Sequence, residues 1–312
     1  MKAANVKLNL VCGLIVAAAG AGVAAAQCGD APKATAAHGT SGGILEVAAS
    51  AGSFKTLLAA IDAAGLKGAL QGDGPYTVFA PTDEAFAALP AGTLDNLLRP
   101  ENKELLQGIL KYHVVSGRLA AADVSGRSGA ATLNGQRLQF AAKDGAVRVD
   151  KARVVKADVG ARNGVIHVID AVVLPSTKNI VETAQGAAKF NTLLTAATKA
   201  GLADTLANGG PLTVFAPTDE AFAKLPAGTL ENLLKPENRD QLANILKYHV
   251  VSGRVYSTDA LAAGKAKTLL GQEIVVASAG GQAKVNGARL LQTDLDASNG
   301  VIHVIDEVIL PQ

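Results

Sequence analysis

GPYTVFAPTDEAFAALPAGTLDNLLRPEN occupies residues 74–102, and GPLTVFAPTDEAFAKLPAGTLENLLKPEN occupies residues 210–238. The second segment repeats the first at an offset of 136 residues (210 minus 74). The same offset holds without a gap through most of the chain, pairing Ile44 with Ile180 and Pro175 with Pro311. A repeat of this length is a whole domain rather than one unit of a solenoid. The sequence therefore predicts two domains of one fold, at residues 40–175 and 176–312.

Each repeat has helical spacing of apolar residues in its first half and strand-like alternation in its second half. In the first copy, a side-chain oxygen of Thr82 or Asp83 is placed to cap the helix DEAFAAL, and residues 101–115 predict a longer helix. Asn134-Gly135 lies between two short apolar runs and predicts a β-hairpin turn. Helices that precede strands favour an α+β domain over a doubly wound sheet.

The N-terminal segment has the form of a secretory signal peptide. Residues 1–26 contain two early lysines, a mostly apolar stretch and the small residues Ala24-Ala25-Ala26 before Gln27. An uncleaved membrane anchor is the alternative. Residues 27–39 are rich in small and polar residues and predict a flexible N-terminal tail. We therefore expect a secreted protein, either extracellular or periplasmic, with no membrane span after cleavage.

The charge balance and the cysteine content argue against a nucleic acid or an anionic membrane as partner and against an internal disulfide. Loss of residues 1–26 removes Lys2 and Lys7, so 29 basic residues become 27 against 27 acidic ones. A balanced chain gives no electrostatic reason to expect a nucleic acid or an anionic membrane as partner. Cys12 leaves with the signal segment and Cys28 is then alone, so we expect no internal disulfide.

Three motifs occur in the same order in both repeats. They are TVFAPTDEAF, the octapeptide KYHVVSGR at residues 111–118 and 247–254, and NGVIHVID at residues 163–170, whose copy at residues 299–306 reads NGVIHVID as well. In order and spacing they resemble the fasciclin domain, also called the beta-Ig-H3/fasciclin domain, over almost the whole of both repeats. The resemblance implies an α+β, fasciclin-type fold, a wedge-shaped β-sandwich flanked by helices, present twice in tandem. It also implies a secreted or surface-attached protein, commonly one of cell adhesion or matrix interaction.

The Tyr-His motif of the family matches Tyr112-His113 and Tyr248-His249. In animal members the region around this motif is implicated in binding cell-surface receptors of the integrin type. We expect either a structural role for these four residues, at the corner between helix and strand, or a partner-binding edge formed around them. The two roles are compatible, because a motif that fixes the corner also shapes the surface there.

Other polar residues of the motifs have structural explanations from the pattern alone. We expect helix capping from Thr82, Asp83, Thr218 and Asp219. His167 and His303 are expected to be neutral imidazoles in strands, hydrogen-bonded to the backbone or to the capping region of the Thr-Asp helix.

Catalysis and metal binding have little support. A hydrolytic reading would join His113 or His167 to Asp83 or Asp170, with Ser116 as nucleophile, but Ser116 does not lie in a GxSxG pattern. His167 and Asp170 lie three apart on a strand and point to opposite faces. Neither repeat has an HExxH or CxxC pattern. We expect no enzyme activity, no metal site and no cofactor.

The sequence thus predicts a protein that acts by binding, in cell adhesion or in cell-envelope or matrix interactions. The expected partner is a cell-surface or matrix protein or a polysaccharide. Two nearly identical domains suggest bivalent binding. The alternative is a carrier of a hydrophobic small molecule such as a carotenoid, which some members of the family bind.

Overall fold

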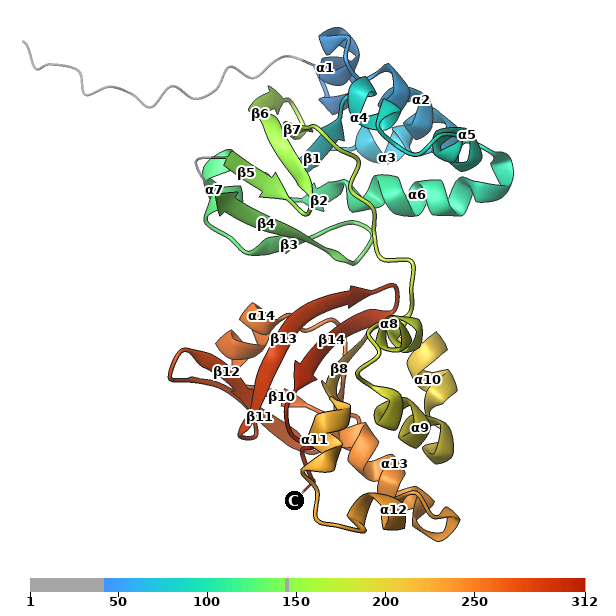
Figure 1. Cartoon of the computed structure of the whole chain (residues 1–312). Helices are drawn as coiled ribbons and strands as arrows, with labels where there is room; N and C mark the ends of the chain where they lie inside the picture. The colour runs from blue at the N-terminus through green and yellow to red at the C-terminus, as the bar shows by residue number, and fades with distance from the viewer. Residues whose placement is uncertain (1–41, 144–145, 312) are drawn as a thin grey trace, which may run out of the picture. The chain divides into compact units, whose positions relative to one another are not determined.

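The computed structural model describes residues 42–143 and 146–311 (Figure 1). The predicted signal peptide at residues 1–26 and the predicted tail at residues 27–39 lie outside these ranges. No helix within the described part of the chain has the length and apolar character needed to cross a membrane.

Among the described residues, each repeat contains seven strands and a set of short helices. In the first repeat the helices are α1 (Ile44–Ala51), α2 (Lys55–Ala64), α3 (Lys67–Leu70), α4 (Asp83–Ala87), α5 (Thr93–Leu97), the 3-10 helix η1 (Pro100–Asn102), α6 (Lys103–Tyr112) and α7 (Ala121–Ser125). Its strands are β1 (Tyr76–Pro81), β2 (Val114–Ser116), β3 (Gly129–Ala131), β4 (Arg137–Lys143), β5 (Ala146–Val149), β6 (Ala152–Ala161) and β7 (Gly164–Ile169).

The second repeat has the same order of elements. Its helices are α8 (Ile180–Gly186), α9 (Asn191–Ala200), α10 (Ala203–Asn208), α11 (Asp219–Ala223), α12 (Thr229–Leu233), η2 (Pro236–Asn238), α13 (Arg239–Tyr248) and α14 (Ser257–Ala263). Its strands are β8 (Leu212–Pro217), β9 (Val250–Ser252), β10 (Lys265–Lys267), β11 (Glu273–Ala279), β12 (Gln282–Val285), β13 (Ala288–Ala297) and β14 (Gly300–Ile305). Below, "first domain" and "second domain" denote the parts of the structure before and after residue 176.

One seven-stranded sheet forms the centre of each domain. The strand order in the first domain is β2-β1-β7-β6-β5-β4-β3, and β1 and β7 form a parallel pair among antiparallel neighbours. A bridge between Val115 and Thr132 joins the two ends of this order, so the sheet is nearly closed. The second domain repeats this arrangement, with a bridge between Val251 and Thr268. The predicted α+β fold, present twice in tandem, is confirmed.

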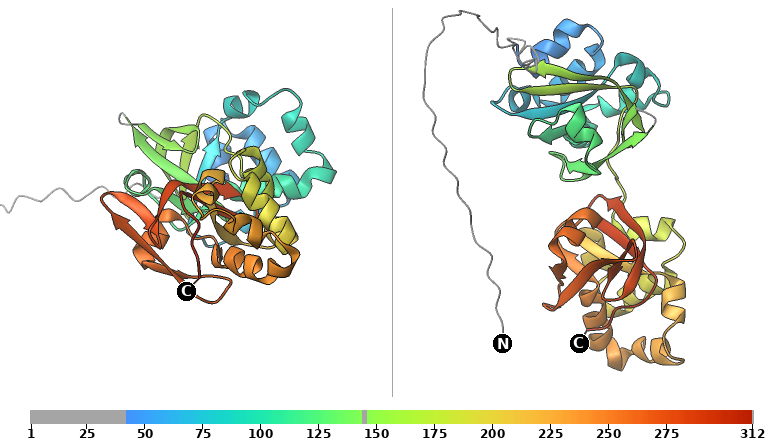
Figure 2. Two further views of the ribbon diagram at one scale, coloured as in Figure 1. Left: turned by 60° about the horizontal axis from the view of Figure 1, so that its bottom comes forward. Right: turned by 90° about the vertical axis from the view of Figure 1, so that its left-hand side faces the viewer.

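Strands β7 and β14 are buried along their whole length, as expected for a continuous apolar run with packing on both faces. On one side of the first sheet the helices α1 to α6 gather, and Ile44, Leu57 and Ile109 contribute to the core there (Figures 1 and 2). A second core, which includes Phe79 and Leu138, fills the space enclosed by the curled sheet. Each domain therefore has its own pair of cores.

The predicted hairpin turn at Asn134-Gly135 connects β3 to β4. Gly135 has φ +90°, and its N–H donates to the carbonyl of Thr132 at 2.9 Å. The Asn134 side chain donates to the carbonyl of Gly108 at 2.8 Å, which ties the turn to α6. The turn therefore positions the strand half of the domain against the helix that ends in the Tyr-His motif.

Candidate functional site

The Thr-Asp pair at the start of α4 caps two different helices. The Thr82 hydroxyl oxygen accepts the N–H of Ala85 at 3.2 Å and so caps α4. The Asp83 carboxylate instead accepts the N–H groups of Thr56 at 2.8 Å and Lys55 at 3.3 Å, which are the first amides of α2. From sequence, either residue was a candidate cap for the helix that follows it. The structure divides the two tasks and so fixes α4 against α2.

The second domain uses the same arrangement. Thr218 accepts from Ala221 at 3.2 Å, and Asp219 accepts the N–H groups of Thr192 at 2.7 Å and Asn191 at 3.3 Å. The Thr56 amide is the main reason that the pKa of Asp83 lies below its ordinary value. For Asp219, partial desolvation raises the pKa, but the hydrogen bonds from Thr192 and Asn191 together outweigh it and lower the pKa.

The imidazoles of the Tyr-His motif are buried at the ends of α6 and α13. His113 and His249 are each 2% exposed, and each Nδ1 lies 2.8 Å from a helix carbonyl, of Ile109 and Ile245 respectively. Because a carbonyl only accepts, Nδ1 carries the proton and Nε2 is an acceptor. Nε2 of His249 accepts the N–H of Ile309 at 3.2 Å, whereas Nε2 of His113 has no partner within the described residues. Burial lowers the pKa of both rings to about 4, so both are neutral at pH 7.

The tyrosines of the motif are also internal. Tyr112 is 4% exposed, and its hydroxyl donates to the Asp150 carboxylate at 2.8 Å. Burial raises the pKa of the Tyr112 phenol, and the nearby charge of Asp150 raises it further. The Tyr248 hydroxyl donates to the Glu273 carbonyl at 3.1 Å and accepts from Asn286 at 2.7 Å. A partner that recognised this corner would therefore contact the surface around the motif, and a partner-binding role for the four residues stays a prediction.

The strand histidines are held by backbone groups. His167 Nε2 lies 2.8 Å from the Leu119 carbonyl, its Nδ1 accepts the N–H of Asp158 at 3.3 Å, and its ring stacks on Phe79 at 5.3 Å between centroids. His303 makes the equivalent bonds to Val255 and Asp294. The hydrogen-bond partners of both rings are thus backbone groups rather than the Thr-Asp helix, and the Asp294 carboxylate lies 4.0 Å from His303 Nδ1.

The hydrolytic combination considered from sequence is not assembled in this geometry. His113 and His167 bond to carbonyls, Asp83 bonds to helix amides, and Asp170 accepts the N–H of Arg153 at 2.7 Å. In residues 42–143 and 146–311, no group of three or more His, Cys, Asp or Glu side chains is placed to hold a metal ion.

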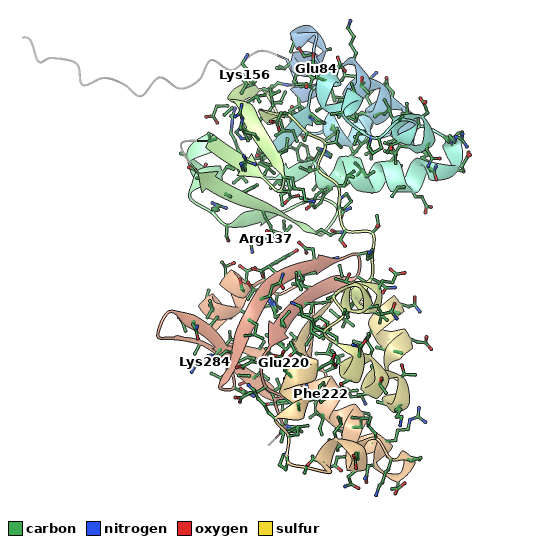
Figure 3. The ribbon with its side chains drawn as sticks, viewed as in Figure 1. Glu84, Arg137, Lys156, Glu220, Phe222 and Lys284 are labelled. Atoms are coloured by element: carbon green, nitrogen blue, oxygen red, sulfur yellow. The ribbon has the colours of Figure 1, made fainter. Side chains whose placement is uncertain are left out.

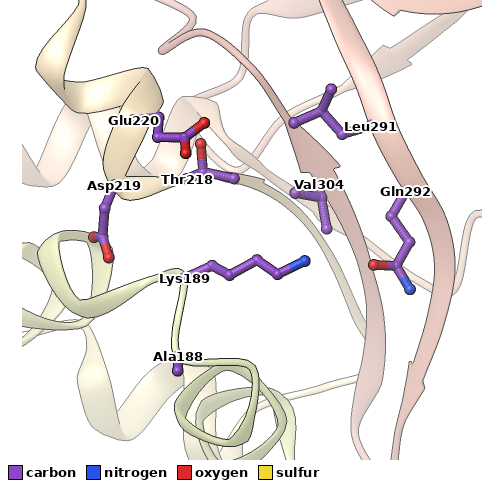
Figure 4. A pocket seen from close by; sticks show the side chains of 8 residues that line it. All are labelled: Ala188, Lys189, Thr218, Asp219, Glu220, Leu291, Gln292 and Val304. Atoms are coloured by element: carbon purple, nitrogen blue, oxygen red, sulfur yellow. The ribbon is translucent and has the colours of Figure 1, made fainter.

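An open hollow lies beside the Thr-Asp turn in each domain. In the second domain it has a volume of about 390 Å³ between α11, the loop before α9 and strands β13 and β14 (Figure 4). Its lining consists of Ala188, Lys189, Thr218, Asp219, Glu220, Leu291, Gln292 and Val304. The hollow of the first domain has about 180 Å³ and is lined by Val47, Ala51, Ser53, Phe54, Thr82, Lys156, Val159, Ile166 and Val168.

The lysines of these hollows, Lys156 and Lys189, were not singled out from the sequence. Figure 3 marks Lys156 on β6, and Figure 4 shows the Lys189 side chain extending from its loop into the second hollow. Their repeat counterparts are Gln292 and Ser53, 136 residues away in each case. Differences between two otherwise similar copies were the available signal, because they mark positions that the shared fold leaves free to vary.

Fold and site together define a protein of two tandem α+β domains. The side chains of its motifs form hydrogen bonds within their own domain, and an open hollow lies beside the Thr-Asp turn of each domain. The fasciclin domain model matches the chain twice, at residues 52–175 and 188–311. The chain belongs to the fasciclin domain family. The precise domain boundaries at residues 40–175 and 176–312 stay predictions.

Relatives of known sequence include bacterial and animal proteins. Protein sll1483 of Synechocystis sp. is 58% identical over 132 residues, which are 42% of this chain and 73% of that protein. Transforming growth factor-beta-induced protein ig-h3 of Sus scrofa is 35% identical, over 79% of this chain and 36% of its own length. Human periostin is 31% identical, over 80% of this chain and 30% of its own. The chain thus spans about a third of the two animal relatives.

A solved structure of similar fold is the FAS1 domain pair from the insect cell adhesion molecule fasciclin I. It is 22% identical in sequence, with a TM-score of 0.41, and the match covers 82% of this chain and 96% of that one.

Proposed function

We propose that the protein is an exported, non-enzymatic binding protein that acts in cell adhesion or in contacts of the cell envelope or matrix. One observation carries the proposal: the side chains of both Tyr-His motifs are only 2–4% exposed and bond within their own domain. Groups used in this way stabilise the fold, and recognition is left to the surface. Membership of a family commonly found in adhesion and matrix proteins supports the same role.

The partner is expected to be a cell-surface or matrix protein or a polysaccharide. A receptor of the integrin type is not carried over from animal members, since the chain has no Arg-Gly-Asp sequence and spans only part of its animal relatives. Protein sll1483, 73% of whose length is covered by the match, is a bacterial protein. This similarity supports the proposal that the protein acts at a bacterial cell surface or in the periplasm.

Two similar domains provide for bivalent binding. A weak contact made twice by one chain gains avidity because the second contact becomes intramolecular, typically by a factor of about 100 or more. The test measures binding of residues 27–312 to an immobilised cell-envelope extract, beside each repeat alone and an equimolar mixture of the two separate repeats. The mixture has the same sites without the link. Equal binding by the mixture and the intact chain would exclude bivalency, and absence of binding by the intact chain would exclude the adhesion role.

The second candidate function is transport or storage of a hydrophobic small molecule such as a carotenoid. The hollow of the first domain supports it, because six of its nine lining residues are aliphatic or aromatic: Val47, Ala51, Phe54, Val159, Ile166 and Val168. The test is to purify the protein from its native host, record the absorbance spectrum and analyse an organic extract by mass spectrometry. A protein without a stoichiometric extractable compound would not be a carrier.

A further inference from the structure

We propose that the hollow beside the Thr-Asp turn of each domain binds an amphipathic carboxylate, a molecule that joins one carboxylate to a short aliphatic body. The inference rests on the second candidate function, the carrier, and names the ligand class of its site. It is carried by three hydrogen-bond donors around an apolar floor at equivalent positions of both domains.

In the first domain the three donors are Lys156, Thr82 and Ser53. The Thr82 oxygen already accepts the N–H of Ala85, so its hydroxyl hydrogen remains to be donated. Within the described ranges, the side chains of Lys156 and Ser53 have neither a hydrogen-bond nor an ion-pair partner. An ammonium and two hydroxyls that line one hollow without an acceptor between them are complementary to an anion with several oxygens.

In the second domain the same three positions are Gln292, Thr218 and Lys189. Thr218 again accepts a helix amide, from Ala221, and keeps its own hydrogen. The lysine thus lies on the strand in the first domain (Lys156) and on the loop in the second (Lys189), where the strand position is the amide Gln292. Each hollow retains one ammonium, one threonine hydroxyl and one further donor.

The floor of each hollow suits an aliphatic body better than a bare inorganic anion. In the first domain it includes the buried side chains of Phe54 and Ile166, and in the second it includes Val304, which is 2% exposed, and Leu291, which is 54% exposed. Both hollows, of about 180 Å³ and about 390 Å³, are open at the surface, so the chain of an eight-carbon saturated acid can lie along the apolar floor and extend out of the hollow.

The two hollows differ in the negative charge around them. The lining of the first has no carboxylate, whereas the second includes Asp219 and Glu220. Both oxygens of Asp219 accept hydrogen bonds from the first residues of α9. Glu220 has no ion-pair partner among the described residues, and it lies over the hollow in Figure 4. Its charge opposes an anion there, so the first domain is expected to bind more tightly.

The experiment follows the amide NMR spectrum of isotope-labelled residues 27–312 during titration with octanoate. We expect saturable shifts at residues that line the two hollows, with the lower Kd in the first domain. Octanamide has the same body without the charge and should bind about tenfold more weakly. Acetate has the charge without the body and should not saturate either site in the same range.

Variants taken from the repeat itself locate the anion. K156Q, which installs the residue found in the second domain, should weaken octanoate in the first domain about tenfold and leave the second unchanged. K189S should do the reverse. E220Q should strengthen the second site, and K151Q, at an exposed lysine outside both hollows, should change neither.

The proposal fails if octanoate produces no saturable shifts at the hollows, if octanamide binds as well as octanoate, or if K156Q leaves binding in the first domain intact. These results are distinct from a failure of the carrier function. A protein that binds octanoate in this way but leaves its native host without an extractable ligand would refute the carrier function alone.

Discussion

At the scale of single residues, the copies differ in how they build the loop beside the hollow. Gly52 has φ +73° at the end of α1, and its counterpart Ala188 has φ +51° just after α8. A left-handed backbone brings the Cβ atom close to the following carbonyl oxygen and costs about 1–2 kcal/mol for residues other than glycine. The second domain therefore has local strain that the first avoids.

Exchange of these two residues should change stability in opposite directions. A188G is expected to stabilise the second domain by up to about 1 kcal/mol, because relief of strain exceeds the added freedom of glycine in the unfolded chain. G52A should destabilise the first by about 1 kcal/mol. A Cβ atom at Gly52 would meet no atom within 4 Å, so the effect is one of backbone conformation.

Urea unfolding measured by far-UV circular dichroism checks both changes. A187G is the matched control, since Ala187 has φ −83° and the same substitution there should destabilise by about 0.5–1 kcal/mol. If A188G and A187G shifted the unfolding midpoint in the same direction, the strain at Ala188 would be refuted.

At the scale of elements, the start of α2 depends on a side chain outside it. Phe54 occupies the N-cap position and makes no side-chain cap, and Asp83 supplies the missing acceptor. The Thr-Asp turn thus ties α4, β1 and α2 together at one point. The turn also forms one edge of the hollow in the first domain. The two caps therefore hold Thr82 at that edge.

Removal of this cap should loosen the first turn of α2. D83A is expected to reduce the free energy of unfolding by about 1 kcal/mol, in the range usual for a lost cap, and to speed amide exchange at Lys55 and Thr56. E84A, at the exposed neighbouring carboxylate, should change stability by less than about 0.5 kcal/mol. Equal effects of the two substitutions would mean that Asp83 acts through charge near α4 rather than as the cap of α2.

Sequence pattern predicted the elements better than their ends. The helix predicted over residues 101–115 begins as η1 and ends at Tyr112, and Val114 already belongs to β2. His113 ends it, because its ring bonds to the Ile109 carbonyl and its own carbonyl accepts the N–H of Phe79 in β1 at 2.9 Å. Apolar spacing continues through such a boundary and does not mark it. Local capping rules likewise do not show that Asp83 accepts the N–H groups of Lys55 and Thr56, which lie 28 and 27 residues away.

At the scale of the whole molecule, the internal repeat was sufficient to predict two domains of one α+β fold, and the fold is confirmed. The hollows could not be predicted from the sequence, because Lys189, Thr218 and Gln292 lie far apart in it and come together only when the sheet forms. The sequence favoured a structural role for the Tyr-His motifs and left a partner-binding edge around them as the alternative. The structure shows that the four side chains are buried. Their burial depends on packing between elements that are distant in the sequence, so local patterns do not reveal it.

Repetition also doubles the effect of the buried histidines on acid stability. Burial lowers the pKa of His113 and His249 from 6.5 to about 4 in the folded protein. Between these values the unfolded chain binds more protons than the folded one, so stability is complete above pH 6.5 and declines as the pH falls toward 4. From pH 7.5 to pH 5 each ring should remove about 2 kcal/mol from the free energy of unfolding.

Burial also lowers the pKa of His303, so this ring adds to the loss of stability in the same range and is present in both the parent and the variant below. The remaining groups act in different ranges or with the opposite sign. Asp83 and Asp219, whose pKa values are lowered, contribute stability above 3.8 that is lost only in stronger acid. Burial raises the pKa of Asp296 to about 6, so its protonation in the folded state offsets part of the histidine effect. The parent chain alone therefore gives a mixed pH profile, and a variant is needed to isolate the two rings.

H113Q and H249Q together remove both titrating rings and leave neutral side chains. Circular dichroism is the suitable probe of urea unfolding, since the chain has no tryptophan. The double variant is expected to be less stable than the parent at pH 7.5, because two buried hydrogen-bonded rings are lost. Its additional loss on going to pH 5 should be smaller than that of the parent by about 4 kcal/mol. Equal losses in the two proteins would mean that these rings remain accessible to protons in the folded state, and the internal role assigned to the Tyr-His motifs would then be wrong.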